Sequence, residues 1–315
     1  VESMVGTTGK NSLSSLMDGF FNAFREVAKN PEQSNYYDTL IAETGKFTNQ
    51  VNRLAKQFEE IEMQTTADIE AHVDEFNRLA GSLAEANKKI GQAGTQVPNQ
   101  LLDERDRIMT EMAKYAEIEV SYESTNPNIA SVRMNGILTV NGQDTYPLQL
   151  QKNKEPMSVQ IYGTDIPLNG GAIQSAIDTK AKITSYKDNL NEFVNSLKKQ
   201  VNTVMKKDFF VEEDAKNIRI NPDFIKDISK MKISAETANR LAGITAEDFK
   251  PGLTYKQALD QLLVGVASDK SSVNAYQNIH KDLLEGIQQE KMSIEGVNME
   301  EEMVNLMAFQ KYFVA

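Results

Sequence analysis

The sequence predicts a mainly α protein, an elongated bundle of long helices with a small antiparallel β domain inserted between them. Apolar residues recur at helical spacing over most of the 315 residues. One stretch, 34–90, has no Pro and is long enough for a helix of about 85 Å. A single stretch, 116–168, instead shows the alternation and turn dipeptides of strands. We therefore expect a long-helix rod domain in two parts, 1–115 and 169–315, and a β domain at 116–168.

The first expected helix covers Ser12 to Ala28. Its apolar residues follow the spacing i, i+3, i+4, i+7 of an amphipathic helix: Leu13, Leu16, Met17, Phe20, Phe21, Phe24 and Val27. Asn30-Pro31 ends the helix, because a residue before Pro resists helical backbone geometry.

The second expected helix is a rod with a heptad seam. Steps of four and three join Phe47, Val51, Leu54, Phe58 and Ile61. Steps of four then join Thr65, Ile69 and Val73, which indicates a stutter. After a loop at 91–98, Asn99 to Tyr115 predicts a third helix. We expect its inward side to carry Leu101, Leu102, Ile108 and Met112, and its polar side Asp103, Arg105, Asp106 and Arg107.

The stretch 116–168 is predicted to be β structure. Ile118, Val120 and Tyr122 alternate with polar residues, as in a half-buried strand. Asn135-Gly136 and Asn141-Gly142 predict hairpin turns, because both central residues of a type I′ turn need positive φ.

Helices dominate the rest of the chain. We expect a helix from Gly170-Gly171 to about Lys206, then a short strand pair at 209–210 and 218–220. A short capped helix follows Asn221-Pro222. A last long helix begins near Thr254, Gly296 interrupts the pattern, and a terminal helix covers 299–314.

Composition excludes several classes of partner. The chain has 34 basic and 45 acidic side chains, a net charge of −11. This charge argues against nucleic acid and anionic membrane surfaces, which need a basic face. The longest apolar run, 262–267, is too short to span a membrane. The absence of Cys removes disulfides, thiolate catalysis and Cys-type zinc sites.

No residue pattern indicates a catalytic, cofactor or metal site. His72, with Asp68 and Glu75 on one helix face, could begin a metal site, but a surface ion-pair face is the favoured interpretation. His280 falls on a helix seam and fits a polar residue that sets register. Phosphate-loop, hydrolase, zinc-protease and Ca²⁺-loop motifs are absent. We expect the protein not to be an enzyme and to need no cofactor.

The run 293–312, SIEGVNMEEEMVNLMAFQKY, is similar to the C-terminal signature of flagellar axial proteins, S-G-V-N-L-D-E-E-M-x-N-L-I-x-F-Q-x-x-Y. The matching residues are Gly296, Val297, Asn298, Glu301, Glu302, Met303, Asn305, Leu306, Phe309, Gln310 and Tyr312. Two further runs, 12–31 and 98–112, resemble SLxxLxDFFNAxxxLxxNP and PNDLLDxRDxLLDEL of the family of flagellar hook-associated protein 1, FlgK.

The resemblance implies a flagellin-like bundle and a structural role at the hook–filament junction of the bacterial flagellum. It implies export by the flagellar secretion system, an extracellular location and a part in motility. The implied partners are hook protein, the second junction protein, neighbouring copies, and an export chaperone at the C-terminal region. The matching residues of 296–312 would be the assembly motif. The uncapped apolar pattern at the C-terminus and the lack of terminal axial helices also lead us to expect a chain cut at both ends.

Two alternatives stay open. Hook-associated protein 3 is disfavoured by the Asn30-Pro31 break and by the run at 98–112. A secreted coiled-coil binding module unrelated to flagella would form a stable oligomer, whereas we expect a junction fragment to be a monomer in dilute solution.

Overall fold

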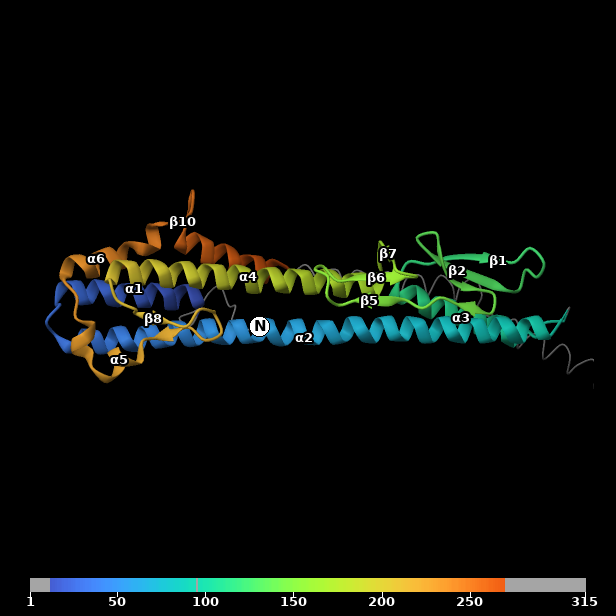
Figure 1. Cartoon of the computed structure of the whole chain (residues 1–315), viewed down its shortest axis with the longest axis horizontal. Coiled ribbons are helices and arrows are strands. Elements are labelled where there is room, and N and C mark those ends of the chain that lie inside the picture. The colour runs from blue at the N-terminus through green and yellow to red at the C-terminus, as the bar shows by residue number, and fades with distance from the viewer. Residues whose placement is uncertain (1–11, 95, 270–315) are drawn as a thin grey trace, which may run out of the picture. The chain divides into compact units, whose positions relative to one another are not determined.

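The computed structural model describes residues 12–94 and 96–269 (Figure 1). The chain divides into two compact units, 1–262 and 263–315. The second unit is described only for 263–269, which are helical. The elements below all belong to the first unit.

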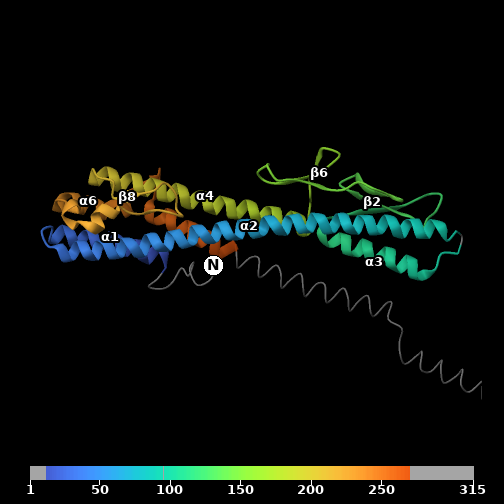
Figure 2. The same cartoon turned by 60° about the horizontal axis from the view of Figure 1, so that its bottom comes forward.

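The longest element is α2, Ser34–Gln92, whose 59 residues span about 90 Å at 1.5 Å per residue. The helices α1 (Leu13–Lys29) and α4 (Gly171–Met205) pack on it, and α3 (Asn99–Tyr115) packs on its C-terminal part (Figures 1 and 2). This architecture confirms the predicted mainly α fold with long helices.

An aromatic core joins α1 to α2 and to the strand after α4. Ser12 starts α1 by accepting a hydrogen bond from the backbone of Ser15 at 3.1 Å. The ring of Phe20 lies within 4.7–6.1 Å of five other phenylalanine rings, and all six are buried. The five are Phe21, Phe24, Phe47, Phe209 and Phe210.

Short elements complete this half of the unit. They are β8 (Phe210–Val211), β9 (Arg219–Ile220), α5 (Pro222–Lys226), η1 (Ile228–Met231), α6 (Ala235–Gly243), η2 (Ile244–Ala246), β10 (Asp248–Lys250) and β11 (Leu253–Thr254). The pairing of β8 with β9 and the capped helix after Asn221 confirm the prediction. A helix begins at residue 255, and Thr254 caps it reciprocally with Gln257.

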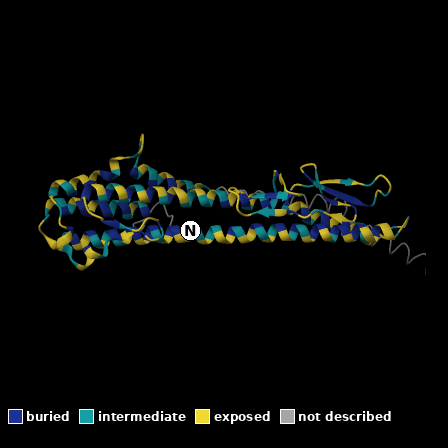
Figure 3. Cartoon of the chain, viewed as in Figure 1, coloured by how far each residue is buried: buried dark blue, intermediate teal, exposed yellow. Residues whose placement is uncertain are grey.

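Two antiparallel sheets cover the other half of α2. One has the order β1 (Glu119–Tyr122), β2 (Ala130–Met134), β3 (Ile137–Asn141), β4 (Asp144–Thr145). The other has the order β5 (Gln149–Gln151), β6 (Ser158–Ile161), β7 (Thr164–Ile166). Their buried aliphatic residues form one core with α2, α3 and the start of α4 (Figure 3).

The hairpin turns are partly as predicted. Asn135 and Gly136 both have positive φ, 48° and 78°, between β2 and β3. At the next hairpin Asn141 pairs with Asp144, so the turn is Gly142-Gln143, one residue later than expected. A third hairpin turns at Tyr162-Gly163, with φ of 52° and 73°. The sequence did not indicate it, because Tyr rarely takes positive φ.

Three expectations about burial are wrong. Val120 and Tyr122 are 41% and 50% exposed, because β1 is the edge strand of its sheet. Leu101 and Leu102 are half-buried instead of inward. Arg105, expected on the polar side of α3, is only 7% exposed.

Candidate functional site

The predicted assembly motif, 296–312, and His280 lie outside the described residues. Candidate functional features therefore come from 12–94 and 96–269. These features include the two runs on which the family resemblance rests, 12–31 and 98–112.

The run 12–31 builds the interior of the first unit. Its phenylalanines supply half of the aromatic core described above. At its end the carbonyl of Pro31 accepts a hydrogen bond from the hydroxyl of Tyr37 at 2.9 Å. The same hydroxyl accepts one from the backbone N–H of Ile233 at 3.3 Å. The run thus fixes the turn from α1 to α2 against the segment before α6.

The run 98–112 anchors the loop between β1 and β2 through Arg105. Its Nη1 donates to the carbonyl of Asn128 at 2.6 Å, and its Nε donates to Asp106 at 2.8 Å. Its guanidinium carbon lies 5.2 Å from the ring centroid of Tyr122. The burial of this charge is tolerated because an acid, a carbonyl and an aromatic face all meet it.

Two asparagines of α2 hold the sheets, and neither was predicted from the sequence. Asn87 is fully buried; its amide donates to the carbonyls of Ala130 and Gly142 and accepts from the N–H of Ala130. Asn77 pairs in the same way with both backbone groups of Leu148. A signal was present for Asn87, because it occupies a seam position between Leu83 and Ile90 where an apolar residue is expected.

A cluster of charges lies where α2 meets the middle of α4. The carboxylate of Glu62 accepts hydrogen bonds from Lys187 and, at 2.9 Å, from Thr184. Lys180 lies 3.9 Å from the same carboxylate and also pairs with Glu155. Burial raises the pKa of Glu62, but the hydrogen bonds and the two lysine charges outweigh it and leave the pKa below its usual value.

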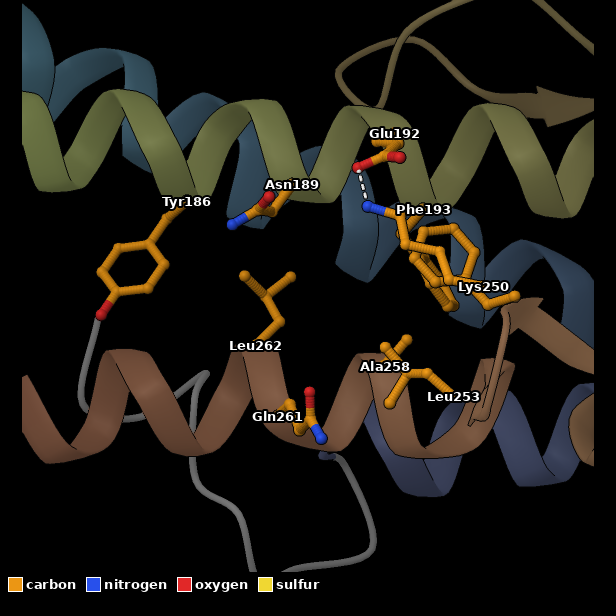
Figure 4. A pocket seen from close by; sticks show the side chains of 10 residues that line it. Tyr186, Asn189, Glu192, Phe193, Lys250, Leu253, Ala258, Gln261 and Leu262 are labelled. Carbon is orange, nitrogen blue, oxygen red and sulfur yellow. Dashed lines mark hydrogen bonds and ion pairs between the residues drawn. The ribbon is translucent and has the colours of Figure 1, made fainter.

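A pocket of about 240 Å³ lies between α4, the β10–β11 hairpin and the helix that begins at 255 (Figure 4). Tyr186 and Asn189 reach into it from α4, and Leu262 faces them from the other helix. Its charged groups, Glu192 and Lys250, pair with each other at 2.7 Å. The pocket thus presents mainly apolar and amide groups.

The carboxylates beside His72 have other partners. Asp68 accepts from Gln64 at 2.9 Å, and Glu75 pairs with Arg78. The His72 ring lies 5.6 Å from that of Tyr115. Over the described ranges, no group of three or more His, Asp or Glu side chains could hold a metal ion.

In the part of the chain that the structure covers, no helix has both the length and the apolar character that crossing a membrane requires.

Residues 1–217 of the 315 match the family model described as "Flagellar hook-associated protein FlgK helical domain". Flagellar hook-associated protein 1 of Escherichia coli K12 is 28% identical over 121 residues, which are 37% of this chain and 22% of that protein. The protein of the same name from Bacillus subtilis is 21% identical over 166 residues, 52% of this chain and 31% of that protein. The matches thus span less than a third of these relatives.

A solved structure has a similar fold. The flagellar hook junction protein FlgK from Burkholderia pseudomallei superposes with a TM-score of 0.53 and 20% identity. The match covers 63% of this chain and 39% of that one.

Proposed function

Because the chain belongs to the family of the flagellar hook-associated protein FlgK, we propose that it is a structural component of the bacterial flagellum at the hook–filament junction. The observation that carries this proposal is the family match over 1–217, which includes α1 to α4 and both sheets of the β region.

The geometry supports a role in packing, without catalysis. The two runs that resemble the family serve the interior: one supplies half of the aromatic core and the other anchors a loop through Arg105. In the pocket, Glu192 pairs with Lys250. In the other cluster, Glu62 pairs with Lys187 and accepts a hydrogen bond from Thr184. We infer that the first unit is a stable wall segment whose outer faces meet neighbouring subunits.

The proposed partners are hook protein, the second junction protein and further copies of this chain, outside the cell. An export chaperone would bind the C-terminal region before assembly. Within that region the motif residues of 296–312 are our candidates for the assembly contact. The relatives named above are all hook-associated protein 1, which favours this role over that of hook-associated protein 3.

Complementation tests the proposal. A strain that lacks the gene should shed filament protein into the medium and fail to swim, and the full-length gene should restore attached filaments. A full-length variant with Phe309→Ser and Tyr312→Ser should be secreted but fail to restore them. A full-length variant with Phe309→Tyr and Tyr312→Phe keeps both aromatic rings; it is the matched control and should restore swimming. Normal filaments in the deletion strain would contradict the junction role.

A further inference from the structure

At one level along their length, the facing parts of α2 and α4 both lack buried apolar residues. From 59 to 68 on α2, the one buried residue is Thr65, whereas Phe58 and Ile69 on either side are buried. From 178 to 189 on α4, the one buried residue is Lys180. The aromatic core lies on one side of this level and the aliphatic core of the β region on the other.

Polar contacts join the two helices at this level. Glu62 of α2 accepts hydrogen bonds from Thr184 and Lys187 of α4, and Lys180 lies 3.9 Å from it. Lys180 also pairs with Glu155, in the segment between β5 and β6. We call these five residues the polar layer.

Hydrogen bonds along α2 are compatible with bending at this level. The hydroxyl of Thr65 donates to the carbonyl of Ile61, and that of Thr66 donates to the carbonyl of Glu62, both at 2.8 Å. Such bonds to the preceding turn favour local bending of a helix, and α2 also has them at Thr44 and Thr48, so they permit bending at the layer but do not mark it. Ile61, expected in the seam, is only half-buried, and the ring of Tyr186 stacks on Phe58 at the edge of the layer, so apolar packing is reduced at this level.

From these observations we propose that the polar layer is a joint at which two halves of the first unit bend relative to each other. The aromatic half contains the core around Phe20, and the β half contains the two sheets β1–β4 and β5–β7. Close-packed apolar cores resist such movement because displaced side chains lose contacts. The pair of Glu62 with Lys187, whose side chains are 18% and 30% exposed, has no interlocking apolar shape and can re-form after a small shift. In the proposed junction, a joint would let one subunit adapt to different partners at its two ends, but the inference itself depends only on the geometry of the layer.

Hydrogen exchange of the full chain tests local stability at the layer. Amides of 59–66 and 180–187 should exchange at least about tenfold faster than those of 48–55 and 72–79, because local opening needs less free energy where few apolar contacts break. Uniform protection along α2 would overturn the proposal.

Substitutions then test whether the polar groups cause the faster amide exchange at the layer. Replacing Glu62→Leu, Thr65→Leu and Lys180→Met together should slow exchange at the layer several-fold and leave the flanking turns unchanged. Glu60→Leu, at an exposed position of the same helix, is the control and should change nothing. If the triple variant does not fold, Glu62→Gln should speed exchange at 180–187, since it weakens the bonds from Lys187 and Thr184. Unchanged exchange in whichever variant is measured would overturn the proposal.

Spin labels measure the bending itself. The chain has no Cys, so introduced pairs are unique. Asn49→Cys with Thr164→Cys spans the layer, and Asn49→Cys with Asn239→Cys stays within the aromatic half; all three positions are exposed. The pair that spans the layer should give the broader distribution of distances between the two labels. That distribution should narrow in the variant with Glu62→Leu, Thr65→Leu and Lys180→Met. Equal widths for the two pairs would contradict a joint.

Discussion

At the scale of residues, a few buried polar side chains connect segments that are far apart in the chain. Asn87 lies 43 residues from Ala130, and Arg105 lies 23 residues from Asn128. Buried polar groups are costly unless their hydrogen bonds are made, so these two residues specify one arrangement of sheet and helix.

Asn87→Ala should destabilise the first unit by about 3 kcal/mol, because it leaves two carbonyls and one N–H without their partner. Urea unfolding followed by circular dichroism measures the change. Asn52→Ala is the matched control on the same helix: Oδ1 of Asn52 is buried without a hydrogen-bond partner in the described part of the chain. We expect it to cost less than about 1 kcal/mol. Equal costs would show that the bonds to the sheet contribute nothing specific.

Asp165 should titrate at unusually low pH. Hydrogen bonds from Lys154, Gln160 and Ser158 lower its pKa to about 2. Because the folded pKa lies below the unfolded value near 3.8, its stabilising effect is complete above about pH 4 and is lost as the pH falls towards 2.

Carboxyl carbon shifts in NMR measure this titration directly. Lys154→Met should move the midpoint of Asp165 upward, whereas Lys114→Met, which removes a lysine paired with Glu111 on α3, should leave it in place. A midpoint near 4 in the unaltered protein would contradict the hydrogen-bonded geometry.

At the scale of elements, neighbouring residues determine where the helices begin, whereas the sheets depend on residues far away in the chain. The start of α1 at a capping Ser and the reciprocal cap at Thr254 follow from neighbouring residues. The sheets instead share one apolar core with α2, and Val132, Val140, Val159 and Ile161 are buried in it. The inserted β domain that we propose at 116–168 is therefore continuous in sequence but dependent on α2 for its interior.

The segment 116–168, prepared alone, should be largely unfolded. It loses the contacts of α2 and α3 that bury its apolar face, and small sheets without such cover are marginal in water. NMR amide dispersion measures the result. A polypeptide of 34–177 is the control, because it restores α2, α3 and the first turns of α4, and its sheet resonances should disperse. Native-like dispersion of the isolated segment would show an independent core.

At the scale of the molecule, the sequence and the fold agree on the family. The resemblance at 12–31 and 98–112 indicated FlgK, the family match covers 1–217, and the fold is similar to that of a solved FlgK. The alternative, a secreted coiled-coil binding module, would form a stable oligomer, whereas a junction fragment would be a monomer.

We expect the 35.2 kDa chain to be a monomer in dilute solution. Its net charge of −11 makes copies repel one another, and the apolar seams of α2 and α4 are already buried within the first unit. Light scattering over a range of concentrations and salt measures the mass. A tight dimer or trimer at physiological salt would favour the binding-module alternative.

The sequence by itself determined the helices, their seams, the β region and the family, because periodicity, caps and turn dipeptides act over a few residues. It predicted the positions of α1 to α4 within a few residues. Only the tertiary structure decided which polar residues are buried. Arg105 is buried against the loop after β1, Asn87 is buried against the sheet, and Lys180 is buried in the polar layer. The cited partners of these residues lie 23 to 118 residues away in the chain. Such distant partners have no periodic signature, and their placement fixes where this protein is rigid and where it can bend.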